Sequence, residues 1–274
     1  MNDQQLSDAD LRKFEEDGYL ILRGYFHPEE IDRIYGMAIR DDVLQKKAID
    51  RGDAEGLRTK LSLWYTLDDS IYSLMARCDR LVGGAEKILG NEVGHFHTKL
   101  MQKEPKKGGA WEWHQDYGYW YRDGFLFPDM VSVMTALTTA NKENGCLQVI
   151  KGSHRMGRIY HGFAGEQVGA DMERVEVTLQ RMELEYVELE PGDSLFFHCN
   201  LLHRSDANLS DHPRWSIISV YNALSNRPFK GSNTSSFTPI DRVSDAAIME
   251  AELTGISEDL EFNEIKSGIE EAKR

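Results

Sequence analysis

The chain has 274 residues, 41% of them hydrophobic, and a formal net charge of -14 at pH 7. This length allows a sizeable core within one large domain, and no apolar run is long enough for a membrane-spanning helix. Because so acidic a chain repels polyanions, we expect neither nucleic acid nor a membrane surface as a partner.

The first forty residues predict a helix, a strand and a second helix. Ser7 and Asp10 form a capping-box pattern, which marks the start of a helix. Residues 19–22 form a short apolar run of the strand type. Pro28 is followed by two glutamates, which is typical of the first turn of a helix.

The next fifty residues predict a loop and then one long helix. Residues 46–58 are charged and contain glycines, so we expect a loop there. Residues 70–89 have the apolar spacing of an amphipathic helix, and Gly90 follows as a typical helix end. The chain up to about residue 90 is therefore predicted to be mainly helical.

From residue 93 the pattern changes to short strands separated by turn signals such as Gly-Gly, Asn-Gly and Pro-Gly-Asp. Such evenly spaced short strands predict a barrel or jelly roll. The strands are expected at residues 93–101, 130–137, 147–150, 194–197 and 215–221.

These elements predict a mainly β fold with flanking α-helices and a jelly-roll, cupin-like core. We expect a single domain over residues 1–274, with a helical part at about 1–90, a β core at about 91–225 and a helical tail at about 240–274.

The ends and the cysteines indicate a cytoplasmic protein. The polar N-terminus lacks the features of a signal peptide, and the C-terminus carries no peroxisomal signal. Cys78, Cys146 and Cys199 are odd in number and widely spaced, which favours reduced, buried thiols over disulfides.

A candidate metal site stands at the start of the β region. His114 and Asp116 are two residues apart, so in a strand their side chains face the same side. His203 follows at the end of another strand-like run. Two histidines and one carboxylate that leave other positions open are typical of non-haem iron(II) oxygenases. The alternative for the His-x-Asp pair is a surface polar pair.

Arg214 adds a candidate site for a carboxylate. It lies 11 residues after His203, across a turn, and a hairpin would return it to the strand beside the metal, with Ser216 on the same face. An arginine binds a carboxylate through two parallel hydrogen bonds, as the distal end of 2-oxoglutarate requires. The alternative for Arg214 is a surface salt bridge.

Several motifs, in this order along residues 11–222, resemble those of the phytanoyl-CoA dioxygenase family, which includes ectoine hydroxylase. The motifs are Trp113-His114-Gln115-Asp116, the run 144–154, Glu190-Pro191-Gly192-Asp193, the run 196–205 and Arg214. The resemblance implies a double-stranded β-helix and an enzyme that uses iron(II), 2-oxoglutarate and O₂ to hydroxylate a C–H bond, with release of succinate and CO₂.

The resemblance also assigns roles to individual residues. The metal-binding and catalytic residues are His114, Asp116 and His203. The residues that match contacts to 2-oxoglutarate are Arg214, Lys60, Ser205, Lys99 and Ser132. His97 stands where ectoine hydroxylase has a glutamine, so ectoine itself is not implied as the substrate. Halogenating relatives have a small residue in place of Asp116, so its presence predicts hydroxylation and not chlorination.

The aromatic residues around the metal motif predict the substrate pocket. Tyr119 and Trp120 are interpreted as one wall, although alternate aromatic residues here are equally expected to fill the core. Arg158 is a candidate grip for an anionic group of the substrate.

The predicted substrate is a small polar metabolite: an amino acid, an amine or a small phosphonate. Three alternatives remain: an acyl-CoA hydroxylase of the same family, a non-catalytic cupin-like metal-binding protein, and a zinc hydrolase. The sequence does not indicate an oligomeric state.

Overall fold

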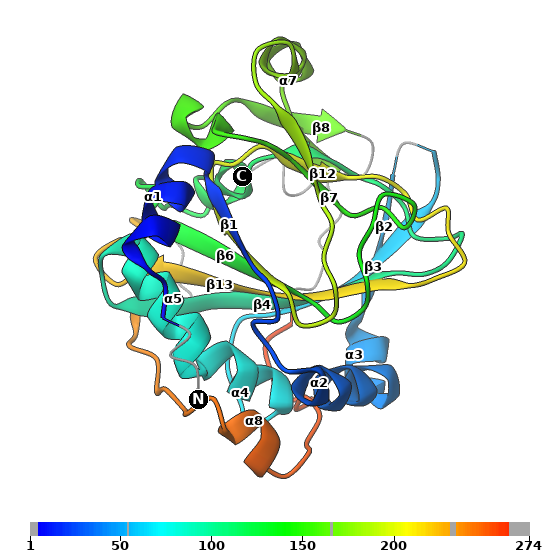
Figure 1. Cartoon of the computed structure of the whole chain (residues 1–274), viewed down its shortest axis with the longest axis vertical. Helices are drawn as coiled ribbons and strands as arrows, with labels where there is room; N and C mark the ends of the chain where they lie inside the picture. Colours follow the sequence, from blue (N-terminus) through cyan, green and yellow to red (C-terminus); the bar gives the residue numbers. More distant parts are fainter. Residues whose placement is uncertain (1–4, 54, 165–166, 231–233, 263–274) are drawn as a thin grey trace.

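Two antiparallel β-sheets that face each other form the centre of the protein. The computed structural model describes residues 5–53, 55–164, 167–230 and 234–262. Seven strands make the first sheet and four make the second, and all pairs within both sheets are antiparallel. Figure 1 shows the helices outside this pair of sheets. This arrangement confirms the predicted mainly β fold with a jelly-roll core.

The seven-stranded sheet has the spatial order β1-β11-β6-β13-β4-β3-β2. Its strands are β1 (Tyr19–Leu22), β2 (Ile49–Gly52), β3 (Arg58–Trp64), β4 (Val93–Lys103), β6 (Met130–Ala136), β11 (Ser194–His198) and β13 (Arg214–Ala223). The long strands at its centre match the predicted apolar runs. The loop predicted at residues 46–58 is wrong, because the edge strand β2 lies there and β3 begins at its end.

The four-stranded sheet has the order β10-β7-β12-β5. Its strands are β5 (Trp111–His114), β7 (Leu147–Ile150), β10 (Leu184–Val187) and β12 (His203–Ser205). A separate hairpin of β8 (His161–Ala164) and β9 (Gln167–Ala170) lies beside β5. The cavity described below lies between the two large sheets.

Most helices cover the outer face of the seven-stranded sheet. They are α1 (Asp8–Asp17), α2 (Pro28–Arg40), α3 (Asp42–Lys47), α4 (Ile71–Arg77), α5 (Asp79–Leu89) and α8 (Ala247–Glu250). The remaining helices are α6 (Asp116–Trp120), α7 (Met172–Leu179) and two 3₁₀ turns, Ser153–Met156 and Thr234–Phe237. One apolar cluster joins these covering helices to the sheet, and a second fills the space between the sheets. The central strands of this sheet, such as β6 and β13, are thus buried on both faces.

Local sequence signals explain where the N-terminal helices begin. The Ser7 side chain accepts from the Asp10 backbone N–H, and the Asp10 carboxylate accepts from Ser7 in return. The single helix predicted at residues 70–89 is two helices, because Cys78 has an extended backbone between α4 and α5.

The C-terminal part of the described chain is mostly extended. Apart from the short α8, no α-helix occurs in the described residues after 240, and the rest of the predicted helical tail, residues 263–274, lies outside the described residues. The Ile256 N–H donates to buried Asp41, and Phe262 pairs with Trp64 at the end of β3. This segment therefore runs across the helical layer and ends beside the cavity. None of the described helices is both long and apolar enough to cross a bilayer.

Candidate active site

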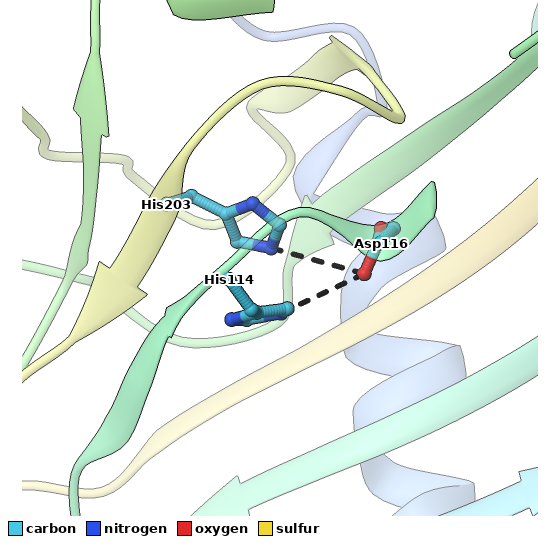
Figure 2. A group of neighbouring side chains, drawn as sticks. All are labelled: His114, Asp116 and His203. Atoms are coloured by element: carbon cyan, nitrogen blue, oxygen red, sulfur yellow. Dashed lines mark ion pairs between the residues drawn. The ribbon is translucent and has the colours of Figure 1, made fainter. Parts of the chain in front are cut away.

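The three predicted metal ligands come together between the two sheets. His114 ends β5, Asp116 begins α6, and His203 begins β12 on the adjacent strand, directly opposite His114. Figure 2 shows the three side chains pointing at one another. The two-residue spacing works for a reason other than the one predicted: Asp116 is not in a strand, but extended Gln115 turns both side chains to the same side.

The two histidines are held in the tautomer that a metal ligand needs. Nδ1 of His114 lies 2.7 Å from the carbonyl oxygen of Glu112, and Nδ1 of His203 lies 2.9 Å from that of Leu201. A carbonyl oxygen only accepts, so each Nδ1 carries the proton. Each Nε2 then presents a lone pair. These lone pairs face Asp116, at 3.6 Å and 3.9 Å from its Oδ1.

The carboxylate ligand is also fixed in orientation and charge. Ser132 donates to Oδ2 of Asp116 at 2.8 Å, which leaves Oδ1 for the metal. Burial alone would raise the pKa of Asp116, but Lys99 and the two histidines lower it well below its usual range. Burial lowers the pKa of His203 to about 3, so this ring is neutral at pH 7. The site thus offers one carboxylate oxygen and two imidazole nitrogens as donors.

These donors fit a divalent ion. All three ligand atoms lie within 4.8 Å of one another and all three residues are buried. One ion at about 2 Å from each atom spans such separations after small side-chain rotations. Two imidazoles and one carboxylate form the set that non-haem iron(II) oxygenases use.

The ligands open onto a cavity of about 1130 Å³ between the sheets. Its floor is the inner face of the seven-stranded sheet, where pocket-lining residues alternate along each strand, as in Leu61 and Leu63 of β3. Tyr119 and Trp120 of α6 line this cavity. This volume accommodates 2-oxoglutarate together with a second small molecule.

Arg214 lies in this cavity, at the start of β13 and nine-tenths buried or more. One Nη donates to the Gly145 carbonyl at 3.0 Å, while its buried Nε has no partner in the described part of the chain. Burial lowers the pKa of Arg214 to about 10, so the guanidinium stays charged at neutral pH. The predicted hairpin is wrong, because β12 and β13 belong to different sheets and the chain crosses from one to the other.

The sequence interpretation missed a second basic residue beside Arg214, namely Lys103. It is completely buried and sits directly opposite Arg214 in the β4–β13 ladder. Its Nζ donates to Oγ of Ser205 at 2.8 Å, and Ser205 itself lines the cavity. Two basic residues that face each other across strands disfavour each other's charged form, and among the described residues neither forms an ion pair. The pair is therefore arranged to receive an anion.

Lys60, the lysine that the sequence assigned to 2-oxoglutarate, lies elsewhere. It is exposed on β3, and the period of two puts it on the face opposite Leu61 and Leu63. Lys103 could have been identified from its position, because it follows Lys99 and Met101 at two-residue spacing on the cavity side of β4.

Two other assigned residues have different surroundings from those predicted. Ser132 is fully buried and contacts the metal ligand Asp116, so it positions that ligand. Arg158 does not line the cavity: it is exposed and its guanidinium stacks on Tyr121 with 4.2 Å to the ring centroid. Lys99, in contrast, does line the cavity and lies 4.0 Å from Oδ1 of Asp116.

The rest of the cavity wall is rich in basic residues despite the acidic chain. The sequence indicates only Arg122 and Asp123 among these residues, as charged neighbours of the aromatic run, because the others come from separate segments. The basic residues are Lys47, Arg51, Arg122, Arg204 and Lys230, together with two acidic residues, Asp123 and Glu261.

Comparisons with known proteins agree with this geometry. The family model described as phytanoyl-CoA dioxygenase matches residues 14–216. An ectoine dioxygenase of Halomonas elongata is 28% identical over 242 residues, which cover 82% of this chain and 72% of that protein. An L-proline trans-4-hydroxylase of Streptomyces griseoviridis is 30% identical over 179 residues, covering 58% of this chain and 66% of that protein.

Solved structures give the same picture. The crystal structure of EctD from S. alaskensis with bound Fe is similar at a TM-score of 0.70 and 25% identity, over 89% of both chains. The carbocyclase SnoK from nogalamycin biosynthesis shares the fold, with a TM-score of 0.65 and 21% identity, over 90% of this chain and 95% of that chain.

Proposed function

The chain belongs to the phytanoyl-CoA dioxygenase family, and we propose from this and its site that it hydroxylates a C–H bond of a small polar metabolite. It is a 2-oxoglutarate-dependent dioxygenase that uses iron(II) and O₂. The observation that carries the proposal is the buried His114, Asp116 and His203 set, which opens onto a cavity that is also lined by the buried guanidinium of Arg214.

We propose that His114, Asp116 and His203 hold the iron(II). When bound there with 2-oxoglutarate, the metal supplies the oxidising chemistry: the co-substrate is decarboxylated to succinate, and an oxygen atom from O₂ enters the C–H bond. The role of the chain is to keep both Nε2 atoms deprotonated and to aim one carboxylate oxygen, through the Ser132 hydrogen bond.

We propose that Arg214 binds the distal carboxylate of 2-oxoglutarate, assisted by Lys103 and Ser205. Burial, and then the nearby Arg214, lower the pKa of Lys103 well below its usual range, so Arg214 carries the main charge. A carboxylate placed here would offset the buried charge of Arg214 and satisfy its buried Nε. Lys60 has no part in this binding.

The substrate would lie against Tyr119 and Trp120, which stand on the wall beside the metal ligands. Tyr119 is fixed by a hydrogen bond from its hydroxyl to the Val168 carbonyl at 2.5 Å, so its ring is a rigid surface. Relatives named for ectoine and for L-proline act on small molecules, and they support a small polar substrate over an acyl-CoA.

We also propose that the chain forms a single catalytic domain in the cytoplasm. The helical layer and the sheet share one apolar cluster, which joins the N-terminal part to the β core. All three cysteines are buried and free, as expected in a reducing compartment.

The test of the proposed function is O₂ uptake and succinate release by the purified protein loaded with iron(II), with and without 2-oxoglutarate. We expect both to require iron(II) and 2-oxoglutarate, and zinc(II) to replace iron without supporting either. Hydrolysis of an ester or amide panel by the zinc form, with no succinate from the iron form, would instead favour a zinc hydrolase. Metal binding with no turnover of 2-oxoglutarate under any condition would favour a binding protein.

A further inference from the structure

One charged side chain interrupts an otherwise apolar row on the cavity floor. Lys99 of β4 pairs with Leu63 of β3 on one side and with Ile218 of β13 on the other, and Ile218 pairs with Met134 of β6. All four residues line the cavity. An ammonium group among apolar neighbours needs a nearby anion to offset its desolvation.

Asp116 provides that anion only while the metal position is empty. Its Oδ1 lies 4.0 Å from the Lys99 ammonium, but the same oxygen faces both histidines as the third metal ligand. In the loaded site, the charges of a divalent ion, Asp116, the 2-oxoglutarate dianion and Arg214 cancel. Lys99 is then the uncompensated charge next to the reaction centre.

A second polar group on the same strand also lacks a partner. His97 lines the cavity two residues before Lys99 and is buried, and its Nε2 has no hydrogen-bond partner in the described part of the chain. Its ring stands edge-on to Trp120, with 5.9 Å between the centroids, and to Tyr65, at 6.2 Å. A buried ring nitrogen left unpaired in this way is destabilising unless a ligand satisfies it.

The outer wall of the cavity also favours an anionic ligand. Lysines and arginines outnumber acidic residues there, although the whole chain carries a net charge of -14. A cavity lined by one sign of charge attracts ligands of the opposite sign. The positive lining is therefore a local feature that a neutral or cationic substrate would not require.

We propose that the primary substrate carries an oxyanion, a carboxylate or a phosphonate, which binds Lys99 and His97 on the cavity floor. This proposal rests on the proposed function and names the substrate class for that site. Since Lys99 lies beside a metal ligand, the oxyanion sits close to the metal, and the oxidised C–H bond is on a carbon near the acid group. Lys99 is thereby a substrate contact and not a contact to 2-oxoglutarate.

The test uses matched pairs of compounds in which only the acid group is changed. Amino acids and aminophosphonates are compared with their methyl esters, and acyl-CoAs are included as a third group. Binding is followed without turnover, under anaerobic conditions, as the change that each compound causes in the absorption band of the iron(II)–2-oxoglutarate complex. Succinate release in air then measures coupling.

We expect one or more free acids to shift the band and to raise succinate release, and their esters to do neither. Lys99→Met should weaken binding of the acid by about 30-fold or more, while the concentration of 2-oxoglutarate that half-forms the band stays unchanged. Lys99→Arg should restore part of the binding, and His97→Phe should weaken it. Lys60→Met, which removes an exposed lysine of the adjacent strand, is the matched control and should change nothing.

Three results would overturn the proposal: equal effects of acids and esters, a response confined to acyl-CoAs, or a Lys99→Met variant whose defect lies in 2-oxoglutarate binding alone. Absence of the absorption band in the unmodified protein is a separate outcome, because it would contradict the proposed function itself.

Discussion

Replacing Arg214 by methionine should raise the 2-oxoglutarate requirement selectively. The guanidinium is buried, and its facing partner Lys103 has a pKa lowered by burial and by Arg214, so no second full charge replaces it. Removing the charged partner of a desolvated carboxylate typically costs about 2–5 kcal/mol, or roughly 30- to 5000-fold in affinity. Arg214→Lys should lose less affinity for 2-oxoglutarate, because lysine keeps the positive charge but not the planar guanidinium that forms two parallel hydrogen bonds.

The assay is succinate formation at varied 2-oxoglutarate and at varied primary substrate, which gives the two KM values separately. Arg204→Met is the matched control: it lines the same cavity but already bonds Gln148 and Asp206. Loss of Arg214 also frees the Gly145 carbonyl, so a thermal melt must show that the variant is folded. Equal shifts in both KM values, or an unchanged KM for 2-oxoglutarate, would refute this reasoning.

Three further predictions concern residues that the structure repositions or explains. Lys103→Met should raise the KM for 2-oxoglutarate, whereas Lys60→Met should not, as measured by steady-state kinetics. A raised KM in Lys60→Met alone would show that Lys60, and not Lys103, contacts 2-oxoglutarate. Ser132→Ala should weaken iron(II) binding about 10- to 100-fold, and an unchanged metal titration would remove its positioning role. Burial lowers the pKa of His198 to about 4, so the unfolded chain binds a proton below about pH 6.5 that the folded chain does not. This contribution to stability is complete above that pH and falls by about 1.4 kcal/mol per pH unit towards pH 4; His198→Gln should flatten the denaturation midpoint over that range, and His212→Gln, an exposed control, should not.

The sequence predicts that His114 and Asp116 point to one side because this depends on local spacing. The extended residue between His114 and Asp116 turns both side chains to one side, whether or not the strand continues. The start of α1 at Ser7 is predicted for the same reason, since a capping box is complete within four residues. Central strands such as β13 are long apolar runs and are recognised directly.

The co-substrate pocket is harder to predict because its parts meet only in the folded sheet. Lys60 and Lys103 are both strand lysines that precede the metal motif, and the strand positions that place one outward and the other inward are fixed only by the pairing of β3 and β4. Lys60 faces outward because Leu61 and Leu63 face the cavity. The sequence also does not reveal that the chain crosses from one sheet to the other between β12 and β13. A turn that joins two strands of one sheet has the same sequence signals as a turn that joins strands of two sheets.

The basic wall of the cavity shows that the net charge of a chain does not predict the local charge of a site. A net charge of -14 describes the whole chain, but Lys47, Arg51, Arg122 and Lys230 converge on the cavity from three separate segments. Arg158, which the sequence favoured as an anion grip, stacks instead on Tyr121.

The most direct test of the central claim is an anaerobic titration of iron(II) and 2-oxoglutarate into the unmodified protein and into His114→Ala, Asp116→Ala and His203→Ala. The account predicts the weak visible absorption of the iron–2-oxoglutarate chelate in the unmodified protein, at one iron per chain, and its loss in each variant while the fold survives. A full-strength band in any of the three variants would show that iron and 2-oxoglutarate bind somewhere else, and would contradict the assignment of this site.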